Sequence, residues 1–241
     1  MDTARIAELL QPFVGSADDQ RLTTNDLQNI STYIDLLLRW NARINLTAVR
    51  EPEEIVTRHF GESLFAARHL FPAKTTWGQP EPALSEVGGA VQAEQSSAPT
   101  RVIDVGSGAG FPGLPIKIWA PSVDLTLIES NHKKSTFLRE VARVLTLMNV
   151  NVFSGRALDY PASPAEVVTL RAVERFETTL PVATNLVAPG GRLALLISEP
   201  QLERARILSP KFKWTAVPVP LSAKRVLAVG TDELAPSRRA S

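Results

Sequence analysis

The chain of 241 residues contains no cysteine, which excludes disulfide bonds, thiolate metal sites and cysteine nucleophiles together. It also lacks any run of the roughly 20 apolar residues that a membrane-spanning helix needs. The first residues, MDTARIAELLQPFVG, carry acidic side chains early and no long apolar stretch, so we expect no signal peptide. These absences predict a cytoplasmic protein that does not associate with a membrane.

The sequence also lacks an excess of charge of one sign, because the formal net charge is only +1. Such a balance is not typical of a strong nucleic-acid binder. The charge is nevertheless unevenly distributed: residues 1–72 hold 7 Lys and Arg against 10 Asp and Glu, whereas residues 101–241 hold 18 against 12. The basic part is compatible with a phosphate-bearing partner, although an ordinary solvated surface explains the same excess.

The N-terminal part of the chain predicts an all-helical cap over residues 1–72. Apolar residues at helical spacing predict a short helix over 3–13 and a longer one that runs from an N-cap at Thr24 to about residue 44. A third helix is expected over 52–70, with a proline in its first turn, where the missing N–H group costs nothing.

Residues 73–99 change character, because Pro, Gly, Ser, Ala and Gln dominate and no hydrophobic period survives. This composition indicates a flexible surface insertion. We therefore expect a linker over 73–100 between the cap and a second unit at 101–235, and a disordered tail at 236–241.

From residue 101 onward, strand and helix patterns alternate. Strands are expected at 101–106, 123–129, 150–155, 165–173 and 192–198, with a terminal antiparallel pair from 213–221 and 224–230. Such alternation is typical of an α/β fold, in which helices cover both faces of a mostly parallel sheet.

The stretch VIDVGSGAGFPGLP (102–115) places a glycine loop directly after the first expected strand. Gly106, Gly108 and Gly110 give one glycine pattern, and the same stretch read from Gly108 gives the dinucleotide fingerprint G-x-G-x-x-G. Glycines at this carboxyl edge let a ligand approach the backbone closely. Glu129, at the end of the second strand, is placed to accept hydrogen bonds from ribose hydroxyls. The pattern predicts a nucleoside-bearing ligand, which NAD and S-adenosylmethionine both satisfy.

Three further features separate these two ligands. Asp104 occupies a strand position where a dinucleotide site has an apolar residue, and its carboxylate suits a cationic, amino-acid-like ligand. Pro112 removes an amide that a pyrophosphate would use. Pro189-Gly190-Gly191 precedes the fifth strand. Together these residues resemble the class I S-adenosylmethionine-dependent methyltransferases, whose sheet is Rossmann-like.

Absences also narrow the methyl acceptor. Methylation of a pyrimidine carbon usually needs a cysteine adduct, and there is no cysteine. Methylation of an exocyclic amine usually relies on an Asn/Asp-Pro-Pro-aromatic turn, and residues 170–173 read LRAV in its place. Guanine N7 carries a free lone pair and no proton, so its methylation needs chiefly positioning. These arguments exclude alternatives more firmly than they select N7.

The segment LLLRWNARINLTAVREPEEIVTRHFGESL (36–64), with VIDVGSGAGFPGLPIKI, LIESNHKKSTFLREV and TLRAVERF, closely resembles the RsmG/GidB family. Members are bacterial 16S ribosomal RNA guanine-N7 methyltransferases that act in the 530 loop of the small subunit. The resemblance covers about residues 25–72 and 101–198. It implies S-adenosylmethionine as cofactor and 16S rRNA or the small ribosomal subunit as partner. We expect a monomer that needs no metal.

The resemblance also assigns site residues. The expected cofactor-binding set is Asp104, Gly106, Gly108, Gly110, Phe111, Glu129, Ala157, Leu158 and Arg171. The candidates for orienting the substrate are Arg58, His59, Lys134 and Arg171, and no general base is assigned. Two departures from the family pattern are Leu158, where an acidic residue is frequent, and Glu62, which replaces Asp in R-H-x-x-D-S.

Each candidate also has a purely structural interpretation. His59 serves equally well as a satisfied, partly buried histidine, and Lys134 as part of a solvated helix surface. Three other functions also stay open: a small-molecule methyltransferase whose cap closes as a lid, a non-catalytic ribosome-assembly factor, and an NAD(P) dehydrogenase.

Overall fold

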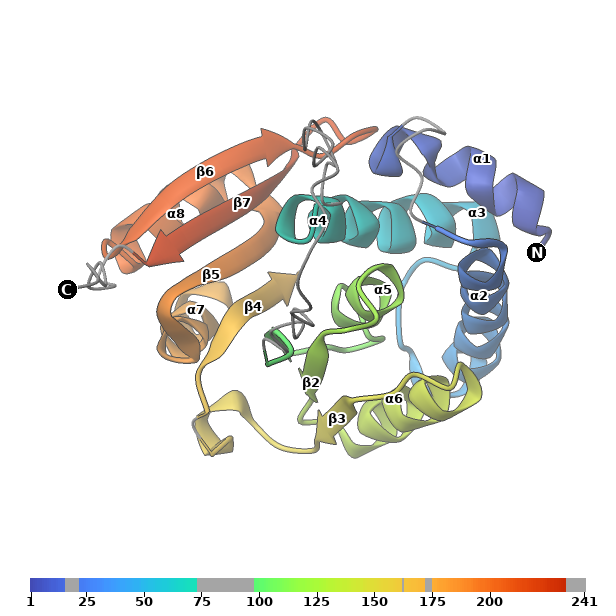
Figure 1. Cartoon of the computed structure of the whole chain (residues 1–241), viewed down its shortest axis with the longest axis horizontal. Coiled ribbons are helices and arrows are strands. Elements are labelled where there is room, and N and C mark those ends of the chain that lie inside the picture. The colour runs from blue at the N-terminus through green and yellow to red at the C-terminus, as the bar shows by residue number, and fades with distance from the viewer. Residues whose placement is uncertain (16–21, 73–97, 162, 172–174, 233–241) are drawn as a thin grey trace, which may run out of the picture.

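The computed structural model describes residues 1–15, 22–72, 98–161, 163–171 and 175–232 (Figure 1). Its seven-stranded sheet has the order β3-β2-β1-β4-β5-β7-β6. The strands are β1 (Arg101–Val105), β2 (Asp124–Ile128), β3 (Val150–Phe153), β4 (Ala165–Arg171), β5 (Val187–Ser198), β6 (Phe212–Pro218) and β7 (Arg225–Asp232). Strands β1 to β5 pair in parallel, and β7 is antiparallel to both β5 and β6. The predicted α/β fold with a terminal antiparallel pair is confirmed.

Helices cover both faces of this sheet. They are α1 (Thr3–Val14), α2 (Thr24–Ile44), α3 (Pro52–Glu54), α4 (Glu62–Leu70), α5 (Gly113–Trp119), α6 (His132–Val144), α7 (Phe176–Asn185) and α8 (Glu199–Leu208). Successive residues of a strand face opposite sides. Thus Val102 joins a core cluster that includes cap residues, whereas Ile103 joins the cluster under α7 and α8. The cap and one face of the sheet therefore share one continuous core.

The N-cap of α2 is Thr23, one residue before the predicted Thr24. The Thr23 hydroxyl accepts the Asp26 N–H group, and the Asp26 carboxylate accepts the Thr23 N–H group at 2.8 Å. This reciprocal capping box needs an acceptor three residues after the cap, a condition that Asp26 meets for Thr23 and Leu27 would not meet for Thr24.

The predicted helix over 52–70 is continuous but not uniform. Its first turn, α3, begins at Pro52, as predicted, and is followed by a π-helix at Ile55–Gly61 and then by α4. Wide π turns are rare and are frequently found at functional sites. Here the turn carries Arg58 and His59, two of the candidate substrate residues. A hydrophobic period cannot reveal it, because the inward side chains Ile55 and Phe60 fit an ordinary helix equally well.

Two differences lie in the second half of the chain. Strand β5 begins at Val187, and the Pro189-Gly190-Gly191 segment lies inside it as a bulge, because the register with β4 jumps from Val187 to Arg192. Gly190 supplies the positive φ of 72° that the bulge requires. Helix α8 was not predicted from the sequence. Among the described residues, none of the helices is long and apolar enough to cross a membrane.

Candidate functional site

The glycine loop after β1 has one open side and one closed side. Gly106, Gly108 and Gly110 have φ angles of 69°, 56° and 91°. A Cβ atom built on Gly106 would meet nothing within 4 Å, and one on Gly108 would lie 3.8 Å from the Gly106 carbonyl oxygen. A Cβ atom on Gly110 would instead collide with the Tyr33 hydroxyl. The backbone is thus open to a ligand at Gly106 and Gly108, while Gly110 packs against the cap.

Gly113, the last glycine of the dinucleotide pattern, lies at the start of α5. A Cβ atom there would be 2.6 Å from the Leu127 side chain and 2.9 Å from that of Asp104. Gly113 therefore permits close packing of a helix on the sheet. The two open positions, Gly106 and Gly108, both belong to the pattern that begins at Gly106, whereas the dinucleotide pattern contains only one of them.

Glu129 lies beside the open part of the loop. Its side chain is 7% exposed; Oε2 accepts the Gly108 N–H group at 2.8 Å, and Oε1 accepts the Asn131 N–H group at 2.7 Å. Each carboxylate oxygen has two lone pairs, so both keep acceptor capacity for hydroxyl groups of a ligand. Glu129 thus holds the glycine loop in shape, a role that the sequence did not reveal, and remains available for its expected contact with ribose.

Asp104 occupies a different environment from the one expected. Its carboxylate is completely buried; Oδ1 accepts the Thr169 hydroxyl at 2.7 Å and Oδ2 accepts the Gly113 N–H group at 3.2 Å. Burial raises the pKa of Asp104 to about 6, against the opposing effect of these hydrogen bonds. Asp104 therefore ties β1 to β4 and α5 beneath the loop. An interaction with a cationic ligand stays a prediction, and because the carboxylate is buried it would have to be indirect, mediated by other groups.

The elevated pKa of Asp104 predicts a specific pH dependence of stability. An acid whose folded pKa lies above its unfolded value stabilises the fold fully below pH 4, and this contribution disappears as the pH rises through 6. A shift from 3.8 to about 6 corresponds to about 3 kcal/mol. In Asp104→Asn the amide replaces the carboxyl without titrating. We expect thermal melts to show the variant gaining stability relative to the parent protein between pH 4 and 7; a difference independent of pH would contradict the assignment.

Phe111 connects the loop to the cap. Its ring is 7% exposed and lies between two cap side chains, with ring centroids 5.4 Å from Tyr33 and 4.9 Å from His59. Both ring faces are therefore covered by protein, and a direct ligand contact of this side chain stays a prediction. The Tyr33 hydroxyl also donates to the Ala109 carbonyl oxygen at 2.5 Å. Sequence reasoning missed Tyr33, which stands in the apolar stripe of α2 between Ile30 and Ile34.

Arg171, at the carboxyl end of β4, was expected to face the ligand or the RNA. Its side chain is only 7% exposed, and its guanidinium donates to the carbonyl oxygens of Arg58 and His59 at 2.5 and 3.4 Å. It also forms an ion pair with Glu62 at 3.0 Å. Burial lowers the pKa of Arg171 to about 10, so it stays charged at neutral pH. In the structure Arg171 joins the sheet to the cap, and contacts with cofactor or RNA remain predictions.

The same Glu62 oxygen accepts a hydrogen bond from Arg225 of β7. One buried carboxylate, 4% exposed, thus holds two arginines from two strands. We call Glu62, Arg171 and Arg225 the arginine junction. It was not predicted, although Glu62 was noticed as a departure from the family pattern; its partner Arg225 lies 163 residues away, and no local pattern links them.

His59 is fully satisfied within the protein. Burial, followed by the charges of Arg171 and Arg58, lowers the pKa of His59 to about 3, so the imidazole is neutral at physiological pH. Its Nδ1 lies 3.3 Å from the Arg171 guanidinium, which can only donate, and Nδ1 therefore accepts. Nε2 then carries the proton and donates to the Thr47 hydroxyl at 2.7 Å. This arrangement matches the structural interpretation of His59.

The remaining candidates are more accessible. Arg58 is exposed and pairs with Glu54 at 2.7 Å across one turn. Lys134 is half-buried in the first turn of α6, where its N–H group donates to the Asn131 side chain. Ala157 and Leu158 begin the 3-10 helix Ala157–Asp159 after β3, and Leu158 is 71% exposed. Within the described ranges, no group of three His, Cys, Asp or Glu side chains is arranged to bind a metal.

Comparisons with known proteins identify relatives of this chain. The family profile described as rRNA small subunit methyltransferase G (GidB) matches residues 26–77 and 86–218. The ribosomal RNA small subunit methyltransferase G of Roseiflexus castenholzii is 37% identical over 177 residues, which cover 71% of this chain and 65% of that protein. The Streptococcus pyogenes serotype M12 protein of the same name is 32% identical over 197 residues, 78% of this chain and 73% of the relative.

Solved structures show a similar fold. The ribosomal protein L11 methylase from Lactobacillus delbrueckii subsp. bulgaricus superposes with a TM-score of 0.54 at 12% identity, over 73% of this chain and 79% of that one. This likeness supports the arrangement of the sheet and its helices. The profile match and the sequence identities support a closer relation, and the chain belongs to the rRNA small subunit methyltransferase G family.

Proposed function

We propose that the protein transfers a methyl group from S-adenosylmethionine to N7 of a guanine in the 530 loop of 16S rRNA. The observation that carries this proposal is the open backbone at Gly106 and Gly108 beside the Glu129 carboxylate, in a chain of this family. The names of the relatives supply the substrate class, ribosomal RNA of the small subunit.

The residues around the loop fit this cofactor. The open side of Gly106 admits the ligand against the backbone, and Glu129 accepts hydrogen bonds from its ribose. Backbone groups of Ala157 and Leu158 meet the edge of the adenine. Phe111 holds the loop against the cap through its stacking with Tyr33 and His59, and a contact of its side chain with the ligand stays a prediction.

Methyl transfer to guanine N7 needs no proton acceptor. Bound S-adenosylmethionine supplies an electrophilic sulfonium methyl group. The N7 lone pair would form the new N–C bond while the S–C bonding pair stayed on sulfur as a thioether, and no proton would leave the base. This agrees with a site in which burial lowers the pKa of His59 to about 3, so that its imidazole is a poor proton acceptor, and in which Asp104 is buried. The protein contributes orientation, worth several orders of magnitude in rate when reacting atoms are aligned.

Two cations orient the RNA in this proposal, the exposed Arg58 and the half-buried Lys134. Arg58, on the π-helix, and Lys134, at the start of α6, are placed to contact phosphates, which fix position without reading sequence. Arg171 contributes indirectly, because its guanidinium holds the backbone of Arg58. We further propose that the protein acts in the cytoplasm as a monomer.

Mapping of 16S rRNA tests the proposal. RNA from cells with and without the gene is digested and analysed by mass spectrometry, and labelled cofactor is incubated with purified small subunits and with naked RNA. We expect an N7-methylguanine in the 530 loop that depends on the protein. Label in small metabolites would favour a small-molecule methyltransferase, and tight binding of cofactor and RNA without transfer would favour an assembly factor.

The substitution Gly106→Ala distinguishes an effect on ligand binding from an effect on folding. The added methyl group has open space, so the variant folds with a modest penalty from the φ of 69°, but the methyl group occupies the ligand side of the loop. We expect the dissociation constant for S-adenosylmethionine to rise at least about tenfold in calorimetry. Gly190→Ala is the matched control, because Gly190 has a φ of 72° within the β5 bulge. Equal affinities of the two variants would place the cofactor elsewhere.

A further inference from the structure

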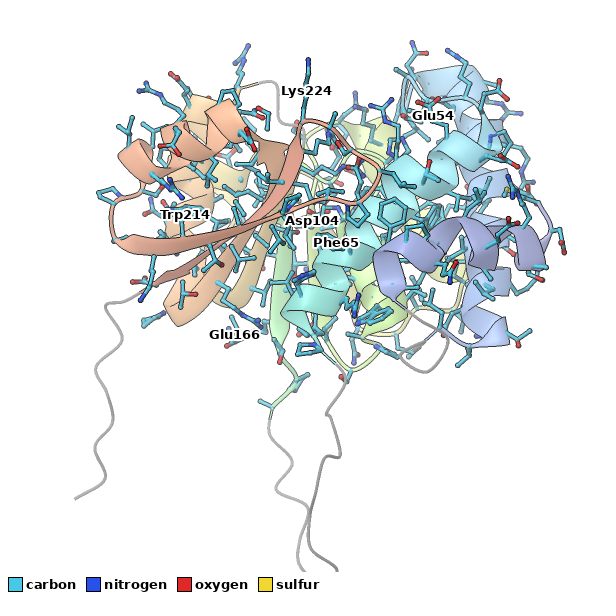
Figure 2. The ribbon with its side chains drawn as sticks, turned by 90° about the horizontal axis from the view of Figure 1, so that it is seen from above. Glu54, Phe65, Asp104, Glu166, Trp214 and Lys224 are labelled. Carbon is cyan, nitrogen blue, oxygen red and sulfur yellow. The ribbon has the colours of Figure 1, made fainter. Side chains whose placement is uncertain are left out.

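The loop between β6 and β7, residues 219–224, lies at the same edge of the sheet as the glycine loop. Leu196 of β5 pairs with Arg171 of β4 on one side and with Leu227 of β7 on the other, and Arg225 pairs with Ser198 at the end of β5. The hairpin therefore extends past the carboxyl ends of the parallel strands. In Figure 2, Lys224 lies at the end of the molecule opposite Glu166, with Asp104 between them.

This hairpin loop is held in place rather than free. The Val219 N–H group donates to the Arg225 carbonyl oxygen at 3.0 Å, and the Ser222 N–H group donates to the Val219 carbonyl oxygen at 3.3 Å. Arg225 then anchors the base of the loop to Glu62 of the cap. The arginine junction thus fixes the hairpin next to the π-helix that carries Arg58.

The tip of this loop presents an apolar side chain to solvent. Leu221 is 75% exposed and has a φ of 56°, a conformation that leucine rarely adopts. An exposed leucine gains nothing from burial, and a left-handed backbone costs stability, so folding alone does not account for this residue. Lys224 is exposed three residues later, and its side chain projects outward (Figure 2).

We infer that the hairpin tip binds a single-stranded segment of the substrate RNA, with Leu221 against a base and Lys224 at a phosphate. This inference rests on the proposed function. The tip begins three strands from β1, about 14 Å away at the usual strand spacing, so it reaches nucleotides that flank the methylated one. RNA is favoured over protein because exposed cations lie next in the chain to both members of the Glu62–Arg225 pair: Lys224 directly precedes Arg225, and Arg58 stands four residues before Glu62. Unstacked bases expose apolar faces that Leu221 suits.

The test uses Leu221→Ser and Lys224→Gln in the full-length protein. For naked RNA containing the 530 loop, we expect each variant to raise the dissociation constant and the KM about three- to tenfold. The affinity for S-adenosylmethionine, measured by calorimetry, stays within twofold. Lys224→Gln also reduces the slope of log affinity against log salt by about 1, because one phosphate contact is lost.

Two matched controls are available away from this edge. Ile207→Ser removes an exposed apolar side chain, 67% accessible, from α8, and Arg143→Gln removes an exposed cation from the last turn of α6. If the hairpin variants bind and methylate RNA as these controls do while the parent enzyme is active, the inference is wrong and the proposed function stands.

Other outcomes are equally decisive. If the hairpin variants are impaired only on intact small subunits, the tip contacts a ribosomal protein, which overturns the RNA assignment. If the parent protein binds RNA but transfers no methyl group, the proposed function fails. The dissociation constants of the hairpin variants for RNA then still test whether the hairpin tip binds RNA. If the parent protein binds neither naked RNA nor small subunits, both the proposed function and the inference fail.

Discussion

Glu129→Ala is expected to raise the dissociation constant for S-adenosylmethionine roughly 100-fold, because hydrogen bonds from ribose hydroxyls to a carboxylate contribute about 1.5–3 kcal/mol each. The same substitution removes the acceptor for the Gly108 N–H group and thereby loosens the loop. Calorimetry with the purified variant measures the total effect. An affinity within threefold of the parent protein would reject the ribose role.

A ligand without ribose hydroxyls separates the two contributions of Glu129. We expect the parent protein to bind a 2′,3′-dideoxy analogue of S-adenosylhomocysteine weakly. We expect Glu129→Ala to bind the analogue and the normal ligand almost equally, because both changes remove the same interaction between carboxylate and ribose. Additive losses would show that Glu129 acts only on the loop. Asn131→Ala serves as control: it removes the cap of α6 at the neighbouring position, costing about 1 kcal/mol of stability without changing the affinity for the cofactor.

Glu62→Ala is expected to lower the free energy of unfolding by about 3–5 kcal/mol, because it leaves the buried Arg171 without its counter-ion and beside Arg225. For a chain of this size, such a loss lowers the melting temperature by roughly 10 °C. Differential scanning calorimetry measures the change.

Glu54→Ala provides the matched control on the same helical segment. Glu54 also pairs with an arginine, but both side chains are about half exposed, so its loss costs within about 0.5 kcal/mol. A double-mutant cycle of Glu62→Gln with Arg171→Gln isolates the pair, and we expect a coupling of about 1–3 kcal/mol. Equal effects of the Glu62 and Glu54 substitutions would show that the arginine junction contributes no more than a surface pair.

The sequence predicted the elements that depend on local patterns. The alternation of strands and helices, the first turn at Pro52 and the glycine loop after β1 all follow from short-range spacing, and the loop's glycines have the positive φ angles that glycine adopts readily. The position of Glu129 at the end of β2 follows in the same way. These features define where a ligand meets the backbone.

The surroundings of the candidate side chains could not be predicted in this way. Phe111 was expected to contact the ligand from the family resemblance, and Arg171 was expected to face it from its place at the carboxyl end of a strand. Their partners, Tyr33 and Glu62, come from the cap, 78 and 109 residues earlier in the chain. Whether an edge residue meets ligand or protein depends on how the cap docks, and a single sequence carries no periodic signal for that.

The bond between Tyr33 and Ala109 has a consequence for synthesis of the protein. Its two residues are separated by 76 positions, so at 5–20 residues per second the ribosome needs about 4–15 s to make the second after the first. During that interval the apolar faces of α2 and α4 have been made but their strand partners have not. The nascent cap therefore carries exposed hydrophobic surface, a natural target for chaperones, until β1 and the loop behind it emerge.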